Sequence, residues 1–265
     1  MDKFKAILKA LLFGAIMLLF LVGSALIAKA LKLTQNRTYI FQGGMVLLSV
    51  IIPVFYIGHK NYSAAEVGLN KPSGNIMKRL LFYLPLLSVC ALVIAFNKNV
   101  GVKSLIVQGF FYGSVAIAAE IYFRGIIQTE LRGKFNVLVG LIFVAILYAA
   151  CNLYYFNRIT SIKHMLVLSV FSIAVAGILG IIIESKGNII FTIVFNAIYL
   201  VITINYTSGN KLLLSQGICL GILFIYGLFL LITYFKANKP EKVEEETDTK
   251  ELENQGFDEN GNMEL

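Results

Sequence analysis

The chain has 265 residues, of which 58% are hydrophobic and only 14% are charged, and its mean hydropathy is +0.78. Soluble globular domains carry about 25% charged residues, so this composition excludes a soluble protein and predicts a polytopic membrane protein. The net charge of +8 does not indicate nucleic-acid binding, because the basic residues are spread over every loop. We expect them to face the anionic surface of the lipid bilayer instead.

Eight apolar runs approach or exceed the roughly 20 residues that a helix needs to cross a bilayer. They cover residues 6–31, 39–58, 77–96, 104–131, 135–156, 165–183, 189–204 and 212–235. The first run is too long for a signal peptide and no small-residue cleavage site closes it, so we expect a signal anchor. The predicted fold class is all-α, a polytopic membrane bundle of about eight transmembrane helices.

Glycines and a proline predict how some of these helices pack. Gly43 and Gly44 would allow close helix contact in the second run, and Pro53 is expected to kink it. Gly177 and Gly180 form a small-residue face on the sixth run.

An even number of spans places both termini on the same side of the membrane. In this topology thirteen Lys and Arg residues lie on the side of the termini and eight on the other. The positive-inside rule therefore predicts that both termini are cytoplasmic.

The end of the chain differs in composition from the rest. Residues 240–265 contain ten of the fifteen acidic residues and only two lysines. We expect a membrane domain over 1–239 and a disordered acidic cytoplasmic tail over 240–265. The tail is either a solubilising end or a docking segment for a basic partner.

The sequence lacks the metal-binding and nucleophile motifs of most known active sites. Its two histidines, His59 and His164, are predicted to lie on opposite sides of the membrane, too far apart to share a metal. There is no HExxH motif, no cysteine cluster and no GxSxG motif. Cys90, Cys151 and Cys219 are isolated in apolar runs, which is typical of small buried residues.

One stretch in the fourth run places two charges at membrane depth. Glu120 and Arg124 are four residues apart, on one face of a helix and within pairing reach. Glu120 is the one good candidate for a general base in the spans, but a guanidinium partner makes a carboxylate a poorer base. We favour a structural ion pair, and catalysis is the alternative.

Two asparagines also lie in the interior of spans. Asn152 is in the fifth run and Asn196 in the seventh. Each is expected to form hydrogen bonds across helices or to face a wet cavity. As zinc ligands both are poor, because zinc prefers imidazole, thiolate and carboxylate.

The stretch Ala119-Glu120-Ile121-Tyr122-Phe123-Arg124-Gly125 resembles the first motif of the CPBP intramembrane metalloproteases. This family, also called Abi, includes the CAAX prenyl proteases and bacterial lysostaphin-resistance-like proteins. The resemblance covers about 60–205, including the loop at 66–69. It implies a helix bundle with an internal cavity, in the cytoplasmic membrane of a bacterium.

The resemblance also implies that this chain is a degenerate member. Ala119 stands where the family has the Glu that acts as catalytic base, and Glu120 and Arg124 keep the rest of the first motif. Tyr148 corresponds to the Phe of the second motif. Asn152 and Asn196 stand where the family has its two metal-binding histidines, and Leu200 stands where the family has its last polar ligand.

Three functions follow as expectations. The first is a pseudoenzyme without cofactor that acts as scaffold or regulator of a membrane-bound partner in the cell envelope, a cell-wall hydrolase or a sensor kinase. The second is an active intramembrane protease that holds zinc through Glu120, Asn152 and Asn196. The third is a transporter or a bacteriocin self-immunity protein that binds a small peptide in a polar cavity.

Overall fold

A computed structural model describes residues 2–69, 76–96, 102–154, 162–185, 187–204 and 210–238. The chain divides into two units, Met1–Tyr234 and Phe235–Leu265. The predicted tail, 240–265, lies outside the described residues. The helical elements, in chain order, are α1 (Asp2–Ala30), α2 (Gln35–Ser49), α3 (Ile51–Lys60), α4 (Ile76–Phe96), α5 (Val102–Glu120), the π-helix η1 (Ile121–Gln128), α6 (Thr129–Leu131), α7 (Val137–Asn152), α8 (Ile162–Glu184), α9 (Ile189–Ile204) and α10 (Asn210–Ala237).

The helices agree with the eight predicted spans. Five are long and apolar enough to cross a membrane: Asp2–Ala30, Gln35–Lys60, Ile106–Leu131, Met165–Glu184 and Gly217–Ala237. Three shorter apolar helices account for the other predicted spans: Leu81–Leu92, Val137–Asn152 and Ile189–Val201. No strand occurs in the part of the chain that the structure describes. The all-α membrane bundle is therefore confirmed.

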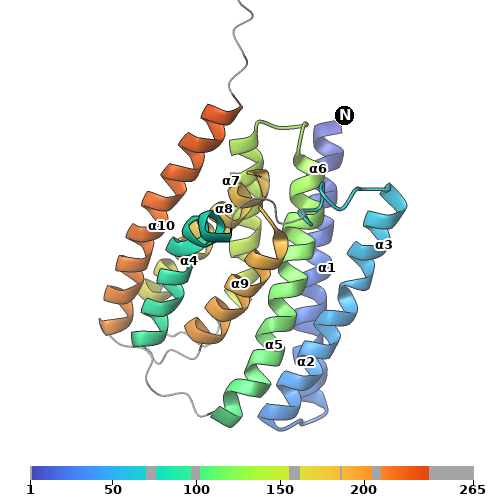
Figure 1. Ribbon diagram of the computed structural model, residues 1–265. Coiled ribbons are helices and arrows are strands. Elements are labelled where there is room, and N and C mark those ends of the chain that lie inside the picture. The colour runs from blue at the N-terminus through green and yellow to red at the C-terminus, as the bar shows by residue number, and fades with distance from the viewer. Residues whose placement is uncertain are drawn as a thin grey trace, which may run out of the picture. The chain divides into compact units, whose positions relative to one another are not determined.

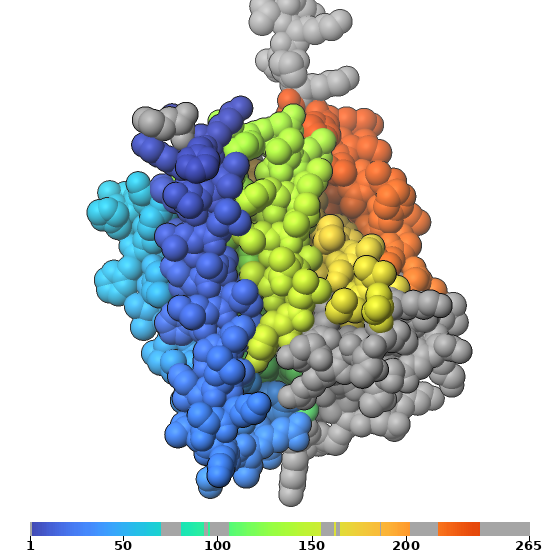
Figure 2. All heavy atoms as spheres, turned by 180° about the vertical axis from the view of Figure 1, so that it is seen from behind, coloured from blue at the N-terminus to red at the C-terminus, as the bar shows by residue number. Residues whose placement is uncertain are grey.

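Helix α5 has a central place among its neighbours. It packs against α2 on one side and α9 on the other, while α7 packs against α8 (Figure 1). On the opposite view α1 and α7 lie side by side (Figure 2). The last turns of α5 and all of η1 are consequently enclosed by other helices, which buries every residue of η1 after Ile121.

Proline explains the break in the second span. Pro53 has no N–H, so it cannot bond the carbonyl of Ser49, four residues earlier. The helix is interrupted there: α2 ends at Ser49 and α3 begins at Ile51. The free carbonyl of Ser49 instead accepts a hydrogen bond from the Tyr122 hydroxyl at 2.8 Å. The predicted kink is confirmed, and it anchors η1.

Gly43 confirms the predicted close contact, whereas its neighbour Gly44 does not take part. A Cβ atom at Gly43 would lie 2.7 Å from the Phe110 ring and 3.3 Å from the Cα of Phe111, while one at Gly44 would meet nothing within 4 Å. The missing side chain at Gly43 therefore lets α2 approach α5 closely.

The same contrast holds for the predicted small-residue face of α8. A Cβ atom at Gly180 would lie 2.6 Å from the Leu141 side chain and 3.3 Å from Gln128 Oε1, whereas Gly177 faces open space. Only Gly180 is therefore required for close packing.

The loop before the core, 62–69, is tied to the end of the bundle. The Glu66 carboxylate accepts a hydrogen bond from the Ser63 N–H at 2.6 Å, and the Glu66 N–H donates to the Ser63 hydroxyl at 3.2 Å. The hydrogen bonds from Ser63 lower the pKa of Glu66. The Glu66 carbonyl accepts from Thr129 and Arg132, which joins the loop to α6.

Candidate functional site

A buried polar cluster joins three helices at the centre of the bundle. Glu120 ends α5, and Arg124 lies one turn later in η1, with its Nε 3.5 Å from Glu120 Oε2. Asn196 of α9 donates from Nδ2 to Glu120 Oε1 at 3.0 Å. The Tyr148 hydroxyl of α7 donates to Asn196 Oδ1 at 2.8 Å. The first-motif carboxylate is thus linked through an amide to the second-motif tyrosine.

Arg124 has further partners that fix its position. Its Nη2 donates to the carbonyl of Ala176 in α8 at 3.1 Å. Its guanidinium carbon lies 4.8 Å from the centroid of the Tyr148 ring, within range of a cation–π interaction. A single side chain in η1 therefore holds α5, α7 and α8 together. A π-helix inside a longer helix is often found at functional sites.

The cluster is closed to solvent. Glu120, Arg124 and Asn196 are each 0% exposed, and Tyr148 is 1% exposed. Removing one charge of such a pair would leave the other buried and uncompensated, which is strongly unfavourable. The Glu120 carboxylate and the Arg124 guanidinium pair with each other, and their other hydrogen bonds are to neutral groups. The cluster therefore has no net charge.

The remaining motif positions divide into apolar and amide residues. Ala119 and Leu200 are 2% and 4% exposed and belong to the hydrophobic core. Asn152, the last residue of α7, is buried one turn beyond Tyr148, and its Nδ2 has no hydrogen-bond partner. The structure therefore brings Glu120 and Asn196 into direct contact, whereas Asn152 interacts with Tyr148 and not with Glu120.

The residues present do not fit a zinc ion. Among the described residues no group of three or more His, Cys, Asp and Glu side chains could hold a metal. The motif positions supply one carboxylate and two amides, without an imidazole or a thiolate. The Asn196 Nδ2 already donates a hydrogen bond to Glu120 Oε1, and the Asn196 Oδ1 already accepts one from the Tyr148 hydroxyl.

The histidines and cysteines do not change this conclusion. His59 is exposed in α3. His164 lies in α8, and its side chain falls outside the described part of the structure. The three cysteines are buried and free, as expected for small residues of apolar helices.

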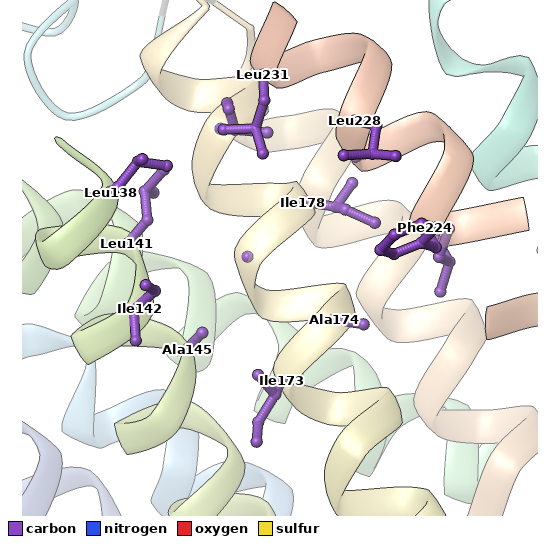
Figure 3. Close-up of a pocket in the computed structure, with 14 residues that line it drawn as sticks. Leu138, Leu141, Ile142, Ala145, Ile173, Ala174, Ile178, Phe224, Leu228 and Leu231 are labelled. Carbon is purple, nitrogen blue, oxygen red and sulfur yellow. The ribbon is translucent and has the colours of Figure 1, made fainter. Parts of the chain in front are cut away.

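An apolar cavity lies apart from the polar cluster. It has a volume of about 260 Å³ and runs along α8 between α7 and α10 (Figure 3). Its walls are wholly apolar, with Leu141 and Ile142 of α7 on one side, Phe224 and Leu228 of α10 on the other, and Ile178 of α8 between them. Neither Glu120 nor Arg124 lines it.

Sequence reasoning missed two polar networks near the end of α6. Arg132 forms a bidentate pair with Glu184, with Nη2 and Nε each 3.1–3.2 Å from the carboxylate. Gln128 donates to the same carboxylate at 2.7 Å. Glu130 forms a second network with Lys134, four residues later. The i, i+4 spacing of Glu130 and Lys134 was the available signal.

The comparison with protein families agrees with this geometry. Residues 101–202 match the family model described as type II CAAX prenyl endopeptidase Rce1-like. Residues 101–202 are therefore similar to the Rce1-like family. The match begins at α5 and ends within α9, so it contains every motif position discussed above. No curated protein and no solved structure matches the chain.

Proposed function

We propose that this Rce1-like membrane protein is not a protease and acts as a scaffold or regulator of a partner in the cell envelope. The observation that carries the proposal is the hydrogen bond from Asn196 to Glu120. At that position the resemblance calls for a metal-binding imidazole. The chain has an amide there, whose two ends satisfy Glu120 and Tyr148.

The other substitutions support the same reading. Ala119 has no group that could act as a base, and Leu200 offers no ligand. Arg124, which is retained, binds the backbone of α8 and the ring of Tyr148. The motif residues that this chain retains hold helices together. The motif residues that it has replaced are those that would act as base or metal ligand.

The proposed partner is a membrane protein, either a cell-wall hydrolase or a sensor kinase, in the cytoplasmic membrane of a bacterium. The support for this class is the resemblance to lysostaphin-resistance-like proteins. With both termini cytoplasmic, the acidic tail would be available to the same partner.

We expect the partner to co-purify with the full-length chain in a mild detergent, with or without a chelator. The Asn152→Leu variant should retain the partner equally, because the Asn152 Nδ2 has no hydrogen-bond partner and Asn152 does not bond Glu120. An active protease with altered ligands would instead need Asn152. Quantitative mass spectrometry of the eluted proteins measures the result.

Three outcomes would count against the scaffold. One is loss of the partner with a chelator or in the Asn152→Leu variant. Another is a partner fragment that accumulates only with the wild-type chain. The third is rescue of a peptide-sensitive strain with no envelope protein bound, which would support self-immunity.

A further inference from the structure

Glu130 is the centre of a second buried cluster, distinct from the Glu120 site. Glu130 Oε1 accepts hydrogen bonds from the hydroxyls of Tyr56 at 2.5 Å and Tyr62 at 2.7 Å. Its Oε2 accepts from the ammonium groups of Lys9 and Lys134, each at 3.1 Å. A carboxylate has about four acceptor positions, so Glu130 has no capacity left for another donor.

The two lysines are held close together by this arrangement. Since Lys9 Nζ and Lys134 Nζ both lie 3.1 Å from Glu130 Oε2, they are at most 6.2 Å apart, twice that distance. Their side chains are 35% and 36% exposed, whereas Glu130 is 2% exposed. An ammonium group has three donors, and each lysine uses one on Glu130. Two fixed ammonium groups thus keep donors free for a second anion.

The surroundings of the two lysines add positive charge, while the nearest further carboxylate, Glu66, acts on Tyr62. Lys60 Nζ lies 6.0 Å from the centroid of the Tyr56 ring, and Lys9 Nζ lies 5.7 Å from the same centroid. With Glu130 and Glu66 counted against Lys9, Lys60 and Lys134, these residues still carry one net positive charge. Burial and the hydrogen bond to Glu130 raise the pKa of Tyr62, so Tyr62 remains a neutral donor and brings no charge.

The cluster lies where the hydrocarbon of a bilayer would end. The start of α1, the end of α3 and α6 are at the same end of the bundle (Figure 1). Leu8 and Leu12, which flank Lys9 on α1, are 57% and 55% exposed. A phosphate bound to the lysines would therefore have an apolar helix surface beside it, along which acyl chains could lie.

We propose that Lys9 and Lys134, positioned by Glu130, bind the phosphate group of an anionic phospholipid. Two ammonium groups a few ångströms apart can contact different oxygens of one phosphate. The exposed leucines beside them favour a lipid over free phosphate as its source. The site is independent of the function proposed for the Glu120 cluster.

The test uses the full-length protein in detergent, titrated with phosphatidylglycerol, phosphatidylcholine or inorganic phosphate. The thermal midpoint of unfolding is followed by circular dichroism. We expect phosphatidylglycerol to raise the midpoint and the other two to leave it unchanged. In a Lys9→Gln/Lys134→Gln variant the apparent affinity should fall about 30-fold, which corresponds to about 1 kcal/mol for each lysine.

Three further variants control for charge and folding. Lys9→Arg/Lys134→Arg should keep the affinity. Lys29→Gln/Lys32→Gln removes two charges at the other end of α1 and should also keep it. In Lys9→Gln/Glu130→Gln/Lys134→Gln the cluster is neutral, so no buried charge is left unpaired, and the lipid effect should still be lost.

The proposal is overturned if the Lys9→Gln/Lys134→Gln variant retains the affinity, or if the Lys29→Gln/Lys32→Gln control loses as much. A midpoint shift with phosphatidylcholine would indicate general lipid solvation of the helices. An equal shift with inorganic phosphate would indicate a soluble anion. Either of these results would also reject the proposal.

Discussion

Replacing Arg124 with methionine is expected to lower the free energy of unfolding by about 3–5 kcal/mol, because it leaves Glu120 as an unpaired buried charge. Both side chains are 0% exposed, so solvent cannot compensate the carboxylate. The variant also loses the bond from Arg124 to the Ala176 carbonyl. Unfolding by sodium dodecyl sulfate in mixed micelles measures the change, with circular dichroism as the signal because the chain has no tryptophan.

The double variant Glu120→Gln/Arg124→Met is the control for this prediction. It removes both charges, and a glutamine at 120 can still accept the hydrogen bond from Asn196. Replacing both members of a buried ion pair is often nearly neutral, so the double variant should recover at least half of the loss. If the double variant lost as much free energy of unfolding as Glu120→Gln and Arg124→Met together, the two charges would not depend on each other.

Asn196→Leu should be the second most damaging change, with a loss of about 3 kcal/mol or more. It removes the donor to Glu120 Oε1 and the acceptor of the Tyr148 hydroxyl in one step. Each buried group left without a partner costs about 1–3 kcal/mol, and a charged group costs more. The same detergent titration measures the effect.

Asn152→Leu is the matched comparison, since it makes the same change at the other amide position of the motif. Asn152 is 6% exposed and its Nδ2 has no hydrogen-bond partner. Replacing an amide whose nitrogen is unsatisfied with an apolar side chain of similar size should cost less than about 1 kcal/mol. Equal losses at the two positions would argue that both amides belong to one shared network.

The spans could be predicted because hydrophobic length in a membrane is set by the bilayer itself. The predicted run 189–204 coincides with α9, Ile189–Ile204. The kink at Pro53 followed from the missing N–H of proline. The hydrogen bond that the kink makes possible could not be predicted, because nothing in the sequence pairs the Ser49 carbonyl with Tyr122, 73 residues later.

The candidate site was predictable in its residues but less so in its contacts. The i, i+4 spacing predicted that Glu120 and Arg124 would meet, and they do. The resemblance grouped Asn152 with Asn196, yet only Asn196 bonds Glu120. Tyr148 entered the sequence comparison only as a replacement for Phe, while its hydroxyl is what bonds Asn196.

The Glu130 cluster shows a different limit. Its four donors come from residues 9, 56, 62 and 134. Only Lys134 is close to Glu130 in sequence, so only that pair has a local signal. The other contacts form because α1 and α3 pack beside η1 and α6, which is a property of the tertiary fold.

The central claim is that the Glu120 cluster is a self-neutralising ion pair and not a metal site. The most direct test is elemental analysis of zinc in the full-length protein, purified without chelator, incubated with zinc and freed of excess metal. We predict far less than one zinc ion per chain, and the same content in the Asn152→Leu variant. About one zinc ion per chain, lost in the Asn152→Leu variant, would contradict the claim.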